Sequence, residues 1–346
     1  MSLDLRRHLL AGQAIPALPL ALDVRRRWDE RHQRALVRYY VDAGVGGLAV
    51  GVHSTQFAIR DPKIALYASV VILAAESAAA WLAPRPRDFV LIAGLCGRTA
   101  QACAEAQIAG ELGYHAGLLS LGAWQRDPEE KILTHCRALA CEIPLIGFYL
   151  QPAVGGRVFT YRFWRAFAEI SGLVAVKIAP FHRYRTIDVV RAVLEAGRDD
   201  VALYTGNDDN IIADLLTPFT FGGRTRHIAG GLLGQWGVWT RRAVELLDAI
   251  KRARAKPRVA AAWLDRNAAL TDANAAIFDA ANNFAGCLPG IHEVLRRQGL
   301  LRTTACLDAH ERLSRGQARE ISRVAAAYPW LTDDAFVTAN LPRWLA

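Results

Sequence analysis

The chain has 346 residues, of which 52% are hydrophobic, and 42 basic against 33 acidic side chains give a formal net charge of +9. The basic residues are scattered, and the densest group, 25–27, is followed at once by Asp29 and Glu30. This pattern argues against a nucleic-acid-binding surface and suits a partner among acidic metabolites. The most apolar stretch, 66–82, is broken by Glu76, and the first residues lack an apolar signal-like core. We therefore expect a cytoplasmic protein that does not enter a membrane.

Short apolar runs recur along the first two thirds of the chain and predict β-strands. Their hydrophobicity is continuous rather than alternating, which is typical of parallel strands covered on both faces. Eight such runs occur, at 15–22, 47–52, 89–94, 116–121, 145–149, 173–178, 201–205 and 227–231.

Amphipathic segments between these runs predict helices. Residues 31–43 and 160–170 each place apolar side chains on one side and are followed by Gly44 and Gly172, as is usual just past a helix end. Alternating strands and helices indicate βα units with right-handed crossovers. Eight units favour a closed (β/α)8 TIM barrel over residues 1–238. A doubly wound open sheet is the alternative, weakened because no G-x-G-x-x-G follows the first strand.

From residue 239 onward the chain shows helical patterns only. This part, 239–346, is predicted to be a C-terminal helical module packed on the barrel. Its predicted helices are 243–254, 259–270, 273–283, 290–298 and 317–327.

Lys177 is the first candidate for chemistry, because it lies near the end of the apolar run 173–178. Reacting groups of a barrel sit at the carboxyl ends of its strands. Burial there disfavours the ammonium form and lowers the lysine pKa. A neutral amine is a nucleophile toward a ketone, which arginine cannot replace. The alternative is a structural lysine that pairs with a carboxylate at the barrel mouth.

Tyr149 ends the preceding strand, and adjacent parallel strands lie about 4.8 Å apart. If both side chains point inward, the phenol can shuttle the protons that carbinolamine formation and collapse require. A core tyrosine with a satisfied hydroxyl is the alternative.

Two loops complete the predicted site. His53, Ser54 and Thr55 follow the second strand, where N–H and O–H donors could hold a carboxylate. Gly206 and Asn207 follow the seventh strand, and glycine allows substrate to approach the backbone closely. The adjacent 208–209 acidic pair is interpreted as a cap of the next helix.

Several segments together resemble the dihydrodipicolinate synthase / N-acetylneuraminate lyase family of class I, Schiff-base-forming aldolases. No single motif is specific, but their order and spacing are. The segments are 42–51, 148–152, 174–177, 203–208 and 287–291. The chain departs from the family where His53-Ser54-Thr55 replaces a Thr-Thr pair, and where 153–156 lacks the arginine of the synthases. The resemblance is thus to a divergent member.

The resemblance implies a lyase, an aldolase or dehydratase, in which Lys177 forms a Schiff base with pyruvate or another 2-keto acid. It further implies Tyr149 as the proton relay, the 53–55 loop as the carboxylate site, no cofactor or metal, and a homo-oligomer, either dimer or tetramer. Two alternatives stay open. One is a metal-dependent lyase or hydrolase using His53, His182 and Asp208, and the other is a non-catalytic ligand-binding barrel.

Overall fold

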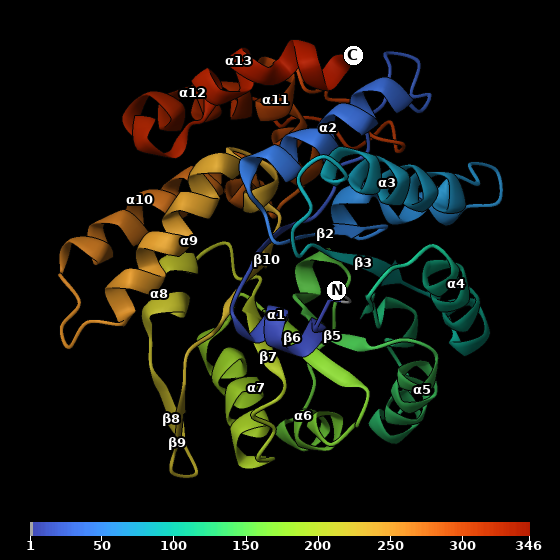
Figure 1. Cartoon of the computed structure of the whole chain (residues 1–346), viewed down its shortest axis with the longest axis vertical. Helices are drawn as coiled ribbons and strands as arrows, with labels where there is room; N and C mark the ends of the chain where they lie inside the picture. Colours follow the sequence, from blue (N-terminus) through green and yellow to red (C-terminus); the bar gives the residue numbers. More distant parts are fainter. Residues whose placement is uncertain (1–2) are drawn as a thin grey trace.

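A computed structural model describes residues 3–346 and shows eight parallel strands at the centre of the molecule (Figure 1). Each forms at one of the apolar runs, and every residue of the eight strands except Leu150 is buried. They are β1 (Ala14–Pro16), β2 (Gly47–Val50), β3 (Val90–Leu95), β4 (Ala116–Leu119), β5 (Leu145–Leu150), β6 (Leu173–Ala179), β7 (Ala202–Thr205) and β10 (Gly230–Leu233).

The strands close into a barrel. Their order is β1-β10-β7-β6-β5-β4-β3-β2, and a parallel bridge between Ala17 and Ala49 joins β1 to β2. The (β/α)8 TIM barrel is therefore confirmed, and the open doubly wound sheet is wrong. The last predicted strand was placed too early, because β10 begins at Gly230, after the short antiparallel pair β8 (Phe219–Phe221) and β9 (Arg224–Arg226).

Helices surround the barrel. They are α2 (Glu30–Ala43), α3 (Tyr67–Leu82), α4 (Thr99–Glu111), α5 (Glu129–Glu142), α6 (Tyr161–Ala168), α7 (Arg183–Glu195), α8 (Ile211–Leu216) and α9 (Thr240–Arg254). The prediction that α2 ends at Gly44 is confirmed, whereas α6, expected over 160–170 with its end at Gly172, ends at Ala168. Helix α2 begins after Asp29, whose carboxylate accepts the His32 N–H, and ends at Gly44 with φ of 93°. Helix α6 begins after Thr160, whose hydroxyl accepts the Phe163 N–H.

Two apolar clusters separate the inside of the barrel from its outside. The inner cluster includes Ile15, Ile92 and Phe148, whereas the larger outer cluster lies between strands and helices and includes Tyr149. Helix α1 (Leu5–Leu10) closes the amino-terminal end of the barrel, where the Tyr204 hydroxyl donates to the Leu9 carbonyl at 2.8 Å. This arrangement leaves the carboxyl ends of the strands as the open end.

The chain ends in four further helices, α10 (Ala262–Ile277), α11 (Cys287–Arg297), α12 (Gln317–Ala327) and α13 (Asp334–Leu345). The predicted helices 259–270 and 273–283 are one continuous helix, α10, and α13 was not predicted. Helix α13 packs on α2, where the buried Trp344 contacts Tyr39 with ring centroids 5.3 Å apart. Helix α9 packs against β1 and α2, and the domain boundary at 238/239 stays a prediction.

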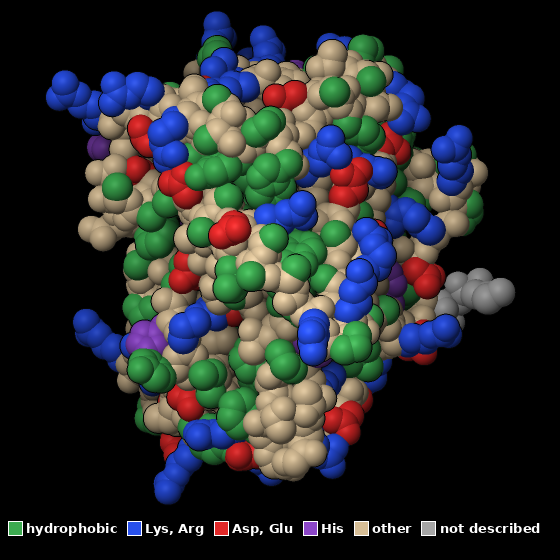
Figure 2. All heavy atoms as spheres, turned by 90° about the vertical axis from the view of Figure 1, so that its left-hand side faces the viewer, with side chains coloured by type: hydrophobic (Ala, Val, Ile, Leu, Met, Phe, Trp, Pro, Cys, Tyr) green, Lys and Arg blue, Asp and Glu red, His purple; other side chains and the backbone are tan. Residues whose placement is uncertain are grey.

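Surface charge is mixed on the face drawn in Figure 2, where basic side chains lie among acidic and apolar ones. Within residues 3–346, no helix has the length and apolar character that crossing a membrane requires.

Candidate functional site

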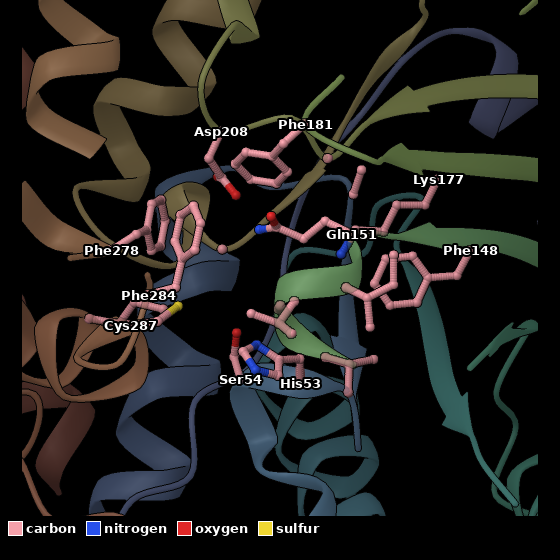
Figure 3. A pocket seen from close by; sticks show the side chains of 18 residues that line it. His53, Ser54, Phe148, Gln151, Lys177, Phe181, Asp208, Phe278, Phe284 and Cys287 are labelled. Atoms are coloured by element: carbon pink, nitrogen blue, oxygen red, sulfur yellow. The ribbon is translucent and has the colours of Figure 1, made fainter. Parts of the chain in front are cut away.

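A pocket of about 610 Å³ opens at the carboxyl ends of the strands (Figure 3). Strand ends, the loops after them and the C-terminal helices all contribute to its walls. The polar side chains that line it are His53, Ser54, Gln151, Lys177, Asp208 and Cys287. The remaining lining residues are apolar or glycine, among them Phe148, Phe181, Gly206, Phe278 and Phe284. Active sites of (β/α)8 enzymes occupy this end of the barrel.

Lys177 extends from β6 into this pocket and is 8% exposed. Its Nζ atom lies 4.3 Å from the centroid of the Phe148 ring, a cation–π contact that holds the side chain. Burial lowers the pKa of Lys177 to about 8, although the charge of Asp208 raises it again in part. A lysine in this state supplies neutral amine near neutral pH.

Gly206 provides the space that Lys177 occupies. A Cβ atom at this position would lie 2.8 Å from Lys177 Cε and 2.7 Å from the Ala179 Cβ. Both distances are shorter than side chains tolerate, so a larger residue here would displace the lysine. The structure thus brings Gly206 and Lys177 together as expected, and it gives the glycine a steric reason.

Asp208 faces the pocket, and the prediction that it caps the next helix is wrong. The residue before α8 is Asn210, and no side chain caps that helix. Instead, one Asp208 carboxylate oxygen accepts the Gln235 N–H at 3.1 Å. Burial raises the pKa of Asp208 to about 7, against the lowering effects of that hydrogen bond and of Lys177. Two titratable groups with opposed shifts therefore share one pocket, as is common at functional sites.

Tyr149 is not brought to Lys177. In the parallel ladder Lys177 pairs with Phe148, and Tyr149 pairs with Ile178, so Phe148 is the residue that points inward beside the lysine. Tyr149 is fully buried on the outer face, against Trp164 at 4.9 Å between centroids. Its hydroxyl accepts the Phe159 N–H at 3.4 Å. The geometry therefore corrects the expected pairing of these two side chains.

The loop after β2 begins with a short turn, η1 (His53–Thr55), of which two residues reach the pocket. Ser54 is buried with its side chain in the pocket wall. Burial, followed by the nearby charge of Lys177, lowers the pKa of His53 to about 4, so its ring is neutral at pH 7. Thr55 does not line the pocket, because its hydroxyl accepts the Gly51 N–H and donates to the Leu18 carbonyl at 2.7 Å.

Asn207 is buried behind the pocket rather than in it. Its side-chain oxygen accepts the Phe181 N–H at 2.9 Å, and its amide nitrogen donates to Thr186 and Asp214 at 3.2 and 3.0 Å. These bonds tie the loop after β6 to the loop after β7. The expected substrate contact of Asn207 is thus replaced by a role in positioning Phe181.

The residues proposed for a metal-dependent reaction are not assembled. His182 is exposed and caps α7, with its Nδ1 accepting the Arg185 N–H, and it does not line the pocket that His53 and Asp208 share. Within residues 3–346 no group of three or more His, Cys, Asp or Glu side chains has a geometry that would hold a metal ion.

Several lining residues have no marker in the sequence. Phe278 and Phe284 come from the chain between α10 and α11, and Cys287 is the first residue of α11, all about a hundred residues beyond Lys177. Only the folded chain brings them to the barrel mouth. Phe148 could have been found from the strand alternation, had the register with β6 been known.

Neither a family model nor a curated protein sequence matches the chain, but many solved structures share its fold. A monomeric dihydrodipicolinate synthase variant superposes with a TM-score of 0.73 at 15% identity, covering 93% of this chain and 98% of that one. N-acetylneuraminate lyase from Fusobacterium nucleatum, complexed with pyruvate, gives 0.71 at 16% identity over 92% and 97% of the two chains.

The dihydrodipicolinate synthase of Cyanidioschyzon merolae, with lysine bound, gives a TM-score of 0.72 at 17% identity and covers 93% of this chain and 99% of that one. The superpositions cover 92–93% of this chain and 97–99% of these three solved structures. The resemblance drawn from the sequence is thereby confirmed in the fold. Because one fold hosts many activities, function has to be argued from the site.

Proposed function

We propose that the chain is a divergent member of the dihydrodipicolinate synthase / N-acetylneuraminate lyase family, and that it acts as a lyase on pyruvate or another 2-keto acid through a Schiff base on Lys177. The observation that carries this proposal is a buried lysine with a pKa of about 8 in the pocket at the open end of the barrel. The pyruvate complex of a lyase with the same fold supports it.

The chemistry requires a nucleophile and a group that moves protons. Neutral Lys177 attacks the keto carbon, and a carbinolamine forms as the Nζ atom gives up one proton and the carbonyl oxygen takes one up. A second proton lets that hydroxyl leave as water, and an iminium remains. The iminium accepts the electron pair of the neighbouring bond, so C–C cleavage, C–C formation or β-elimination can follow.

We assign proton transfer to Asp208. This is the role that was predicted for Tyr149 from the sequence. Its carboxyl group lies in the same pocket as Lys177, whereas the Tyr149 hydroxyl is buried behind the strand. A pKa of about 7 means that the acid and the carboxylate are both populated near neutral pH. This is the state that favours a general acid and base.

The carboxylate of the substrate is proposed to bind at the turn after β2. The Ser54 hydroxyl and the neutral His53 ring line the pocket there, and both can offer hydrogen-bond donors. Thr55 shapes this turn from behind. The expected oligomer remains a prediction, which size-exclusion chromatography with light scattering would test.

Borohydride trapping tests the proposal. Hydride adds to the imine carbon and leaves a stable secondary amine, so wild-type protein incubated with pyruvate should gain the mass of a reduced adduct, with peptide mapping placing it on Lys177. Lys177→Ala should show no adduct, and Lys131→Ala, on the exposed side of α5, should trap like wild type. A folded wild type that traps neither pyruvate nor other 2-keto acids would refute the Schiff base and favour the ligand-binding alternative.

A further inference from the structure

A second hollow, of about 330 Å³, adjoins the pocket that holds Lys177. We call it the distal chamber. Its walls come from α10, from the chain after α10 and from the loops after β6 and β7. The residues that line it are Phe181, Asp208, Asp209, Thr271, Asn274, Ala275, Phe278, Ala280 and Phe284. Phe181, Phe278, Phe284 and Asp208 also line the first pocket, so the two spaces share one wall.

The shared wall is aromatic and held in place. Phe181 and Phe284 meet edge to face with ring centroids 5.8 Å apart, and Figure 3 shows both rings beside the Asp208 carboxylate. Both residues have positive φ values, 50° and 66°, a conformation that is energetically unfavourable for a non-glycine residue. The Phe181 N–H is anchored on Asn207. Neighbouring structure therefore fixes the two rings against this cost.

The chamber offers few free hydrogen-bonding groups. The Thr271 hydroxyl donates to the Asp209 carbonyl at 2.8 Å, and the Asn274 amide nitrogen donates to the Asp208 carbonyl at 2.7 Å. Asp209 lies exposed at the outer rim. The side-chain oxygen of Asn274, a residue only 2% exposed, is buried and has no partner within residues 3–346.

These features select for a particular kind of group. A polyhydroxylated tail would give up its water for mostly apolar walls that replace few of those hydrogen bonds, and each group left unpaired weakens binding. A flat apolar ring has no such loss and gains edge and face contacts with the phenylalanines.

We infer that the substrate is a 2-keto acid whose carbon chain carries an aromatic ring, and that this ring occupies the distal chamber. The inference rests on the proposed function and specifies its substrate class. Lys177 binds the keto end of the substrate in the first pocket. The carbon chain crosses the wall of phenylalanine rings, so that the aromatic ring lies in the distal chamber.

A competition in one tube tests the inference. Wild-type protein is reduced with borohydride in the presence of pyruvate, 4-(4-hydroxyphenyl)-2-oxobutanoate and 2-keto-3-deoxygluconate at equal concentrations, and intact-mass spectrometry gives the ratio of adducts. Ala275→Trp fills the chamber from the exposed side of α10, and Ala268→Trp is a matched control on the same helix, exposed and outside the chamber. Because the intrinsic reactivity of the three acids is the same with every variant, it does not contribute to the change in adduct ratio between variants.

We expect the aryl adduct to exceed the polyhydroxylated adduct at least about tenfold in wild type and in Ala268→Trp, since one well-filled apolar contact supplies about 1–3 kcal/mol. In Ala275→Trp this ratio should fall at least about tenfold while the pyruvate adduct is unchanged. A wild-type ratio at or below one, or a ratio that Ala275→Trp leaves unchanged, would overturn the inference. Absence of every adduct, pyruvate included, would overturn the proposed function and this inference with it.

Discussion

The pH dependence of imine formation tests the pairing of Lys177 with Asp208 most directly. Only the neutral amine attacks a ketone, so the rate of trapping at low keto-acid concentration should follow the deprotonated fraction of Lys177. With a pKa of about 8, roughly a tenth of the lysine is neutral at pH 7. A lysine at its ordinary value of 10.5 would be about 300-fold less available at that pH.

The rate should therefore rise about tenfold per pH unit below pH 7 and level off above about pH 8. Asp208→Asn should change this profile in two ways. Because the carboxylate raises the pKa of Lys177, its removal should move the midpoint to lower pH. Because the proton-transfer group is lost, the plateau should fall by about 10² or more.

The assay is quenched-flow trapping with pyruvate across this pH range, using buffers of constant ionic strength. Asp265→Asn is the matched control, since Asp265 is exposed on α10 and lines neither pocket. Its pH midpoint should match that of wild type, and its plateau rate should lie within about twofold of the wild-type plateau rate. A wild-type midpoint near 10, an upward shift in Asp208→Asn, or an unchanged plateau would refute the reasoning.

Three further substitutions probe the site and its support. Gly206→Ala places a Cβ 2.8 Å from Lys177 Cε and should reduce trapping by about 100-fold. The control Gly110→Ala, whose Cβ meets open space, should trap like wild type. Near-normal trapping by Gly206→Ala would show that the lysine has room to shift. Tyr149→Phe should leave trapping within about twofold, and a larger loss would restore Tyr149 as the relay. Trp344→Ala, which empties a fully buried site under α13, should cost about 3–5 kcal/mol in urea unfolding, and a cost below about 1 kcal/mol would mean that α13 adds little to stability.

Local patterns in the sequence were sufficient for most of the fold. Continuous apolar runs located all eight barrel strands, and Gly44 located the end of a helix. The predictions were wrong where tertiary contacts, rather than local sequence, determine where an element begins or whether it forms. The chain at 227–229 reads as strand but precedes it, since Ala229 donates its N–H to Leu203 while the β10 ladder starts one residue later. Helix α13 lacks a strong pattern of its own and depends on packing against α2.

In the candidate site, too, one part could be predicted from local sequence and another part depends on tertiary contacts. Lys177 was predictable because a lysine inside an apolar strand loses its hydration, a cost that proteins accept mainly where the amine has chemistry to perform. The pairing with Tyr149 was not, because a one-residue change of register exchanges the two faces of a strand. The ladder between β5 and β6 contains such an irregularity at Leu145 and Ile146. The inward position beside the lysine is therefore occupied by Phe148, and the ionisable partner, Asp208, comes from the loop after β7.

The C-terminal helices have a consequence for how selectivity is built. The groups proposed for the chemistry, Lys177 and Asp208, belong to strands of the barrel or directly follow them, whereas Phe278, Phe284 and Asn274 belong to α10 and the chain after it. Substitutions at these later residues can change which substrate group fits beside the reacting carbons, and they leave the position of Lys177 unchanged. Sequence divergence in this part of the chain would then change the substrate while the imine chemistry is kept, which is the pattern expected when one barrel supports many reactions.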